Sequence, residues 1–134
     1  MSQVETKLKL TQVGRVVVQV TDRERALDFY VGMLGLEKVV DVSMGPGAWW
    51  IEVAVAGAPT TIALTPPRPP ADVAEGVETG IILDTTDVEA DHAALKAAGA
   101  DVDAEITRYG APVPPMFWVR DPDGNSLTVV QPNR

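Results

Sequence analysis

The sequence predicts an α+β fold in which two βαβββ modules form a curved mixed sheet around a cleft. Three observations support this prediction. Two runs rich in β-branched and aromatic residues, 116–120 and 126–131, flank a turn-forming break at 121–125 and predict a β-hairpin. The order strand, helix, strand, strand, strand occurs twice along the chain. The landmarks of the two copies are separated by nearly constant distances in sequence.

The composition indicates one soluble domain. A chain of 134 residues that is 46% hydrophobic and 22% charged can bury a self-sufficient core. The chain has no cysteine, which excludes disulfides and thiolate chemistry, and its net charge of −8 argues against nucleic acid and anionic membrane surfaces. No apolar run approaches the ~20 residues of a membrane span, and the charged first ten residues lack a signal-peptide core. We therefore expect a cytoplasmic protein without a nucleic-acid or membrane partner.

The first module is expected at about residues 11–65, after a polar segment that predicts either a loose tail or an edge strand. Its first strand, 13–21, alternates, so that Arg15, Val17 and Gln19 share one face and three valines share the other. Two interpretations of the first face remain open. It could simply face solvent, or Arg15 and Gln19 could line a polar cavity on the inside of a curved sheet.

Local signals predict the remaining elements of the first module. Asp22 is placed as a helix N-cap, and apolar residues at spacings of three and four continue to Gly35, which ends the helix. Three strands follow at 36–43, 48–55 and 60–65, and turns rich in glycine and proline separate them.

A proline-rich segment, 66–78, is the expected linker, because proline cannot donate a hydrogen bond to a sheet ladder. Each side of the linker is too small to be stable alone, which indicates a single domain over residues 1–134. The second module, about 79–131, begins with a strand at 79–85. The order of elements then repeats.

The second module carries the same helix and strand signals. Asp87 is the predicted N-cap, the helix ends at Gly99, and a strand follows at 101–108 before the C-terminal hairpin. In the hairpin turn, Gly124 or Asn125 can adopt a positive φ. The offset between the two predicted N-caps equals, within one position, the offset between the two helix-ending glycines. This agreement indicates an internal duplication.

The chain resembles the vicinal oxygen chelate superfamily, which includes glyoxalase I, extradiol dioxygenases, and bleomycin- and fosfomycin-resistance proteins. Three segments carry the likeness and together span both modules. They are Asp22…Ala26-Leu27-Asp28-Phe29-Tyr30…Leu34-Gly35-Leu36, Asp87-Val88…Leu95…Gly99-Ala100 and Asp121-Pro122-Asp123-Gly124-Asn125…Val130-Gln131. The resemblance implies the predicted fold and a homodimer.

Members of this superfamily usually hold a divalent metal with His and Glu side chains on strands. The resemblance places the four ligand positions at Arg15, Gly80, Ala63 and Thr128. Gly80 follows Arg15 at the same offset at which Thr128 follows Ala63, as expected for equivalent positions. None of the four side chains is a normal metal ligand, the residues one position away are not ligands either, and a guanidinium at this place would repel a divalent cation. We therefore expect no metal site of the standard kind and no cofactor.

Arg15 is the most informative of these four residues. Its guanidinium could stand at the metal position and hold a carboxylate, phosphate or enolate oxygen of a small molecule. Alternatively, Arg15 could form a salt bridge with Asp84 or Glu52. Either carboxylate could also act as a general base if it were buried.

Aromatic residues in the third strand of each module are candidates for a binding wall. Trp49-Trp50 and Phe117-Trp118 match at a spacing of 68, and alternation directs one residue of each pair inward. They could be ordinary core residues, or Trp50 and Trp118 could form a flat apolar wall with the loop 109–115 as its rim. His92, the only histidine, lies in the middle of a predicted helix and is expected to be a packing residue.

The leading functional prediction is a metal-free protein that binds a small organic molecule, such as a drug or secondary metabolite, in its cleft. The predicted ligand contacts are Arg15, Gln19, Trp50, Asp84, Trp118 and Thr128. Three alternatives remain open. They are a lyase-, isomerase- or dioxygenase-like enzyme that uses Arg15 and a carboxylate, a protein with a metal on non-standard ligands, and a protein that acts only through its interfaces. No catalytic residue is assigned.

Overall fold

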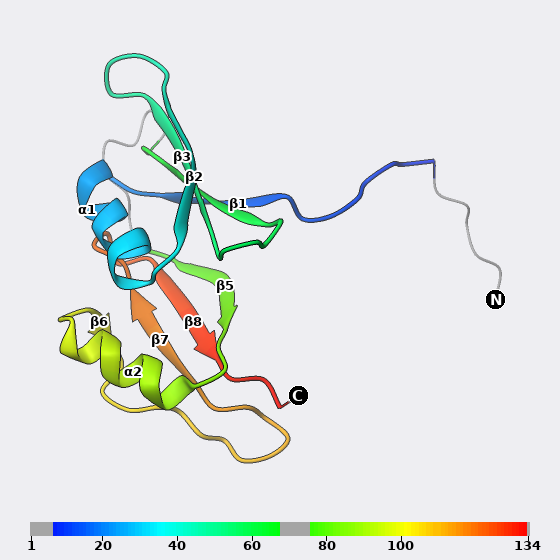
Figure 1. The fold of residues 1–134 in the computed structure, drawn as a ribbon, viewed down its shortest axis with the longest axis vertical. Coiled ribbons are helices and arrows are strands. Elements are labelled where there is room, and N and C mark those ends of the chain that lie inside the picture. The colour runs from blue at the N-terminus through cyan, green and yellow to red at the C-terminus, as the bar shows by residue number, and fades with distance from the viewer. Residues whose placement is uncertain (1–6, 68–75, 134) are drawn as a thin grey trace.

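A computed structural model describes residues 7–67 and 76–133, and its elements form two βαβββ modules (Figure 1). The predicted α+β fold is therefore confirmed. The first module contains β1 Arg15–Gln19, α1 Arg23–Leu27, η1 Asp28–Met33, β2 Glu37–Ser43, β3 Trp49–Ala54 and β4 Thr61–Thr65. The second module contains β5 Glu78–Asp84, α2 Val88–Ala97, β6 Asp101–Val102, β7 Met116–Arg120 and β8 Ser126–Val130.

Each module forms its own four-stranded sheet, in the orders β1-β4-β3-β2 and β5-β8-β7-β6. The first strand of each module runs parallel to the last, and the other neighbours are antiparallel. Strands β1 and β5 line a common groove, with Val17 and Gln19 on one side and Glu78 and Thr79 on the other. No backbone pairing joins these two edge strands in the described part of the chain, so the predicted curved sheet is divided into two.

The strand registers establish the internal duplication. Val17 pairs with Ala63 in the first module, and Ile82 pairs with Thr128 in the second. Ile82 follows Val17, and Thr128 follows Ala63, at one common offset, which is the offset that the sequence predicts for the two modules. Gly80, the counterpart of Arg15, lies at an irregularity of β5 and has a φ of +75°, a conformation that favours glycine.

The predicted match between the tryptophans of the third strands is wrong by two positions. Glu52 pairs with Ala63 and Trp118 pairs with Thr128, so Trp118 is the counterpart of Glu52. The same spacing makes Met116 the counterpart of Trp50. The prediction failed because it compared aromatic pairs, whereas the ladder hydrogen bonds determine the register. A shift of two positions preserves the face of a strand, so Trp50 and Trp118 still lie on equivalent faces.

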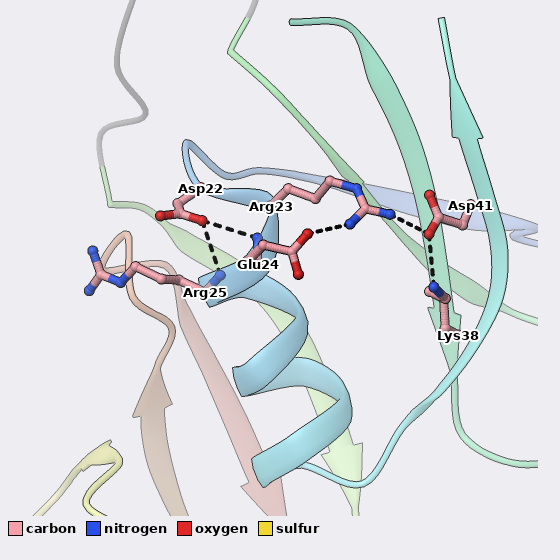
Figure 2. Close-up of polar contacts among 6 residues, drawn as sticks. All are labelled: Asp22, Arg23, Glu24, Arg25, Lys38 and Asp41. Atoms are coloured by element: carbon pink, nitrogen blue, oxygen red, sulfur yellow. Dashed lines mark hydrogen bonds and ion pairs between the residues drawn. The ribbon is translucent and has the colours of Figure 1, made fainter.

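The predicted N-caps are confirmed. The carboxylate of Asp22 accepts hydrogen bonds from the backbone N–H groups of Glu24 and Arg25 at 3.0 and 3.1 Å (Figure 2). Asp87 accepts one from Ala90 at 3.0 Å. Each cap satisfies an N–H group that has no partner inside its helix.

The first helix differs from the single helix that the sequence predicts. It begins as α1 and continues as the π-helix η1, in which Leu34 N donates to Phe29 O at 2.9 Å. Phe29 and Tyr30, which are adjacent in sequence, are both buried in this wider turn and meet edge to face at 4.9 Å. Such π-helical turns arise from tertiary packing as much as from local sequence.

Ion pairs on the surface tie the start of α1 to strand β2 (Figure 2). Arg23 pairs with Asp41, and also with Glu24 at 2.5 Å, while Lys38 pairs with Asp41 at 2.8 Å. The bond from Arg23 and then that from Lys38 lower the pKa of Asp41, and the same carboxylate raises the pKa of Arg23. Exposed pairs of this kind orient the helix but add little to stability.

Strand β6 is much shorter than the strand predicted at 101–108. The strand ends at Val102. Beyond it, Asp103 N still donates to Trp118 O at 3.1 Å, and an isolated bridge joins Thr107 to Met116. His92 explains the break, because the Asp103 carbonyl lies 2.7 Å from His92 Nε2, and Trp118 N donates instead to the Asp103 carboxylate at 3.0 Å. The Asp103 carboxylate thus replaces the Asp103 carbonyl as the acceptor for Trp118 N.

One hydrophobic core extends through both modules. It combines the inner faces of the sheets with one face of each helix, including Phe29, Leu95, Phe117 and Leu127. The C-terminal hairpin is confirmed, and Gly124 in its turn has a φ of +83°. None of the described helices is long and apolar enough to cross a membrane.

The segments outside the modules are only partly described. Residues 7–14 form neither helix nor strand, and they run away from both sheets (Figure 1). This agrees with a tail rather than an edge strand for the described part of 1–11. Most of the predicted linker, residues 68–75, lies outside the described residues.

Candidate functional site

A polar cluster on the open face of the first sheet is centred on Glu52. Its carboxylate accepts hydrogen bonds from Trp50 Nε1 and Thr61 Oγ1, both at 2.7 Å, and from Arg15 Nε at 3.5 Å. Strand pairing creates the cluster, because Arg15 pairs with Thr61 and Glu52 pairs with Ala63 on the neighbouring strand β4. The four side chains come from three strands, so the rigid sheet holds their geometry.

Glu52 is an anion with its hydrogen-bonding capacity largely used. The hydrogen bond from Thr61, then that from Trp50, and the charge of Arg15 lower the pKa of Glu52, and together they outweigh the effect of burial. A carboxylate with a lowered pKa is a weak proton acceptor near neutral pH. Glu52 therefore fits the role of an anchor for its neighbours better than that of a general base.

Arg15 is anchored at one nitrogen and open at the others. Only Nε contacts Glu52, and the terminal nitrogens have no hydrogen-bond or ion-pair partner among residues 7–67 and 76–133. The Arg15 side chain is 56% exposed, whereas that of Glu52 is 11% exposed. Of the two salt-bridge partners considered from the sequence, the structure shows Glu52 and not Asp84.

The equivalent face of the second sheet is more apolar. Thr128 is buried and lies between Trp118 on β7 and Ile82 on β5, and Ile82 is 61% exposed. Trp118, the counterpart of Glu52, is half-buried. The open face is therefore polar in the first module, and in the second module the equivalent face is aromatic.

The structure does not bring the six predicted contacts into one pocket. Gln19 lines the groove between β1 and β5, and Asp84 lines a cavity between η1 and α2. None of the five best-defined pockets in the described part of the chain joins Arg15 and Trp50 to Trp118 and Thr128. The predicted cleft is therefore not closed within a single chain.

The residues at the four positions that the resemblance assigns to metal ligands do not fit a divalent ion. Arg15 is a cation, Gly80 and Ala63 carry no donor atom, and Thr128 offers one neutral hydroxyl. Among the residues that the structure describes, no group of three or more His, Asp or Glu side chains is arranged to hold a metal.

His92 is a packing residue, as expected. It is 8% exposed, and its ring meets Phe117 edge to face at 5.0 Å. Thr61, in contrast, is a site residue that the sequence reasoning missed. Strand alternation already placed Trp50 and Glu52 on one face, but the contact with Thr61 depends on which strands pair.

The structure is that of a small protein with two βαβββ modules. Each sheet has one open face, which carries polar side chains in the first module and more apolar ones in the second. The chain belongs to the Glyoxalase/Bleomycin resistance protein/Dioxygenase superfamily, whose family model matches residues 12–129. The resemblance found in the sequence is thereby confirmed.

Individual relatives cover nearly the whole chain. TnmS3, an antibiotic binding protein from Streptomyces sp. CB03234, is 32% identical with a TM-score of 0.79, covering 94% of this chain and 99% of its own. A superfamily member from Sphaerobacter thermophilus DSM 20745 is also 32% identical, with a TM-score of 0.82, covering 92% of this chain and 99% of its own. The uncharacterized protein YetH of Bacillus subtilis (strain 168) is 28% identical over 121 residues, which are 87% of this chain and 94% of YetH.

Proposed function

We propose that this protein binds a small, flat organic molecule with an acidic oxygen on the open face of its first sheet, without a metal ion. The observation that carries the proposal is the state of Arg15, which is fixed through Nε on Glu52 and leaves its terminal nitrogens open. The likeness to TnmS3, an antibiotic binding protein, supports a binding function.

The guanidinium of Arg15 is the reason for proposing a ligand with an acidic oxygen. A guanidinium presents parallel N–H donors that match a carboxylate, and charge-assisted hydrogen bonds of this kind are stronger than neutral ones. Because Glu52 already holds one edge of the guanidinium, less side-chain freedom is lost when a ligand binds. The ligand would thus meet a donor that is already oriented.

The indole ring of Trp50 is the reason for proposing that the ligand is flat. Its indole N–H donates to Glu52 at 2.7 Å, so the ring is held at the same carboxylate that Arg15 Nε contacts. An aromatic side chain next to a guanidinium offers an apolar surface and a polar handle to the same ligand. Trp50 and Arg15 together would bind a planar ring that carries a carboxylate or phenolate.

A second copy of the chain would complete the site. Apolar side chains on the open faces of both sheets are exposed, with Val17 at 54% and Ile82 at 61%. None of the best-defined pockets in the described part of one chain is lined by both Arg15 and Trp118. We infer a homodimer in which the first module of one chain faces the second module of its partner, so that Trp118 and Thr128 cover a ligand held by Arg15.

We propose no reaction. The lowered pKa of Glu52 disfavours a general base beside Arg15, and no second carboxylate, His or Lys joins the described cluster. The enzyme alternative therefore gains no support from the geometry, and binding remains the better account.

A quenching titration tests the proposal with two probes of matched shape, 4-nitrobenzoate and 4-nitrobenzamide. Both are nitroaromatic quenchers of tryptophan fluorescence, and only the first carries an anionic group. We expect saturable quenching by the carboxylate and binding about tenfold weaker for the amide, the range of one charged hydrogen bond. Equal affinities, or no saturation with the carboxylate, would contradict the proposed ligand class.

A further inference from the structure

A separate cavity lies between the two helices, away from Arg15. The end of η1 and the turn after it form one wall, and the end of β5 with Asp91, Ala94 and Leu95 of α2 forms the other. The cavity encloses about 290 Å³. None of Arg15, Trp50, Trp118 and Thr128 lines it.

The body of this cavity is apolar and extends toward the first sheet. Met33, Leu34 and Leu95 line it, together with Leu36, Val55 and Leu83. The last three also line a neighbouring cavity of about 280 Å³ between β3, β4 and β5. These shared side chains form a common apolar wall of the two cavities. The inter-helix cavity alone is roomy enough and apolar enough to cover the body of a small ring compound.

Two carboxylates give the cavity its charge. Asp84 and Asp91 line it, both are exposed, and no Lys, Arg or His is among the lining residues. Neither carboxylate has an ion pair or hydrogen bond in the part of the chain that the structure describes. Acidic residues elsewhere do have such partners, for example Asp41 and Asp103.

The start of α2 does not cancel this negative charge. The partial positive charge of a helix N-terminus resides on its free N–H groups, and Asp87 already accepts a hydrogen bond from one of them, at Ala90. The carboxylates of Asp84 and Asp91 therefore remain available to a cation.

We propose that this inter-helix cavity is a second small-molecule site, which binds an organic ammonium ion with an aromatic or aliphatic body. The apolar walls would cover the body, and Asp84 and Asp91 would pair with the ammonium group at the rim. The site gives Asp84 a ligand of opposite charge to the one proposed for Arg15. It does not depend on the function proposed for the first sheet.

The test compares 2-naphthylmethylammonium with 2-naphthylmethanol, which has the same ring and no charge. Backbone amide NMR spectra of the full chain are recorded during each titration. We expect the ammonium to bind about tenfold more tightly, with the largest shifts at residues 83–85 and along α2. Equal affinity of the two probes, or shifts centred on Arg15 and Trp50 instead, would overturn the proposal.

Variants separate the site from general attraction to an acidic protein. The double variant Asp84→Asn/Asp91→Asn should weaken ammonium binding about tenfold or more. Asp28→Asn removes one exposed carboxylate on η1 outside the cavity and should change the affinity by less than about twofold. Equal losses in both variants would overturn the proposal, because only the net charge of −8 would then attract the probe. Amide spectra without ligand verify that each variant folds.

Discussion

The Tyr30 hydroxyl donates a hydrogen bond of 2.8 Å to Oδ2 of Asp121, which lies 91 positions further along the chain, in the other module. Burial and the negative charge of Asp121 raise the pKa of Tyr30, so the hydroxyl keeps its proton. Asn125, in the same turn as Asp121, donates to the Gln19 carbonyl at 2.9 Å. The turn of the C-terminal hairpin thus joins the second module to the first.

Replacing Tyr30 with Phe should destabilise the protein by about 1–3 kcal/mol, because a buried carboxylate loses one of its donors. Thermal unfolding followed by circular dichroism measures the effect as a fall in Tm of several degrees. Tyr109→Phe is the matched control, since Tyr109 is 69% exposed and has no hydrogen bond among the described residues. An equal Tm for Tyr30→Phe and the control would show that the bond does not hold the modules together.

The low pKa of Glu52 should make stability depend on pH. A carboxyl whose pKa is lower in the folded state stabilises that state above its unfolded pKa, and the contribution is lost as pH falls through the folded value. The wild-type protein should therefore lose part of its stability below about pH 4.5, the ordinary value for Glu. Glu52→Gln should show a smaller fall in Tm between pH 7 and pH 3. If the Tm of Glu52→Gln falls as much as that of the wild type, other carboxyl groups cause the acid sensitivity.

The shared-site model predicts complementation between two inactive variants. Arg15→Gln and Trp118→Ala should each bind 4-nitrobenzoate poorly, because each lacks one wall of every site. Mixing and refolding the two chains gives hybrid dimers in which one site is intact, so ~25% of the wild-type sites should return for random pairing. Calorimetric titration counts these sites. If each chain forms its own site, none will return.

The protein should not bind a stoichiometric divalent metal. Dialysis against Zn²⁺, Ni²⁺ or Mn²⁺ followed by elemental analysis should give far less than one ion per chain, because Arg15 repels cations and Gly80 and Ala63 offer no ligand. One tightly held ion per chain would refute the metal-free part of the proposed function.

Local signals in the sequence accounted for most of the fold. The N-caps Asp22 and Asp87, the hairpin turn at 121–125 and the constant offset between the modules are each properties of short segments or of their repetition. Such features do not depend on distant partners, which explains why they could be predicted.

The features that differed from the predictions depend on distant contacts. Strand β6 ends early because His92 bonds to the Asp103 carbonyl, and no pattern within 101–108 contains that information. The tryptophan match failed because the register of β3 is set by β4. The relative placement of the two sheets is likewise a tertiary property, and it puts Asp84 in the cavity between the helices, away from the face that carries Arg15.

The most direct test of the central claim is the affinity of Arg15→Gln for 4-nitrobenzoate, measured by titration calorimetry. The matched control is Arg108→Gln, because Arg108 is also an exposed arginine paired with one glutamate, with a side chain 53% exposed against 56% for Arg15. We predict a loss of about tenfold or more for Arg15→Gln and less than about twofold for Arg108→Gln. Unchanged binding in Arg15→Gln, or an equal loss in both variants, would contradict a ligand held by Arg15.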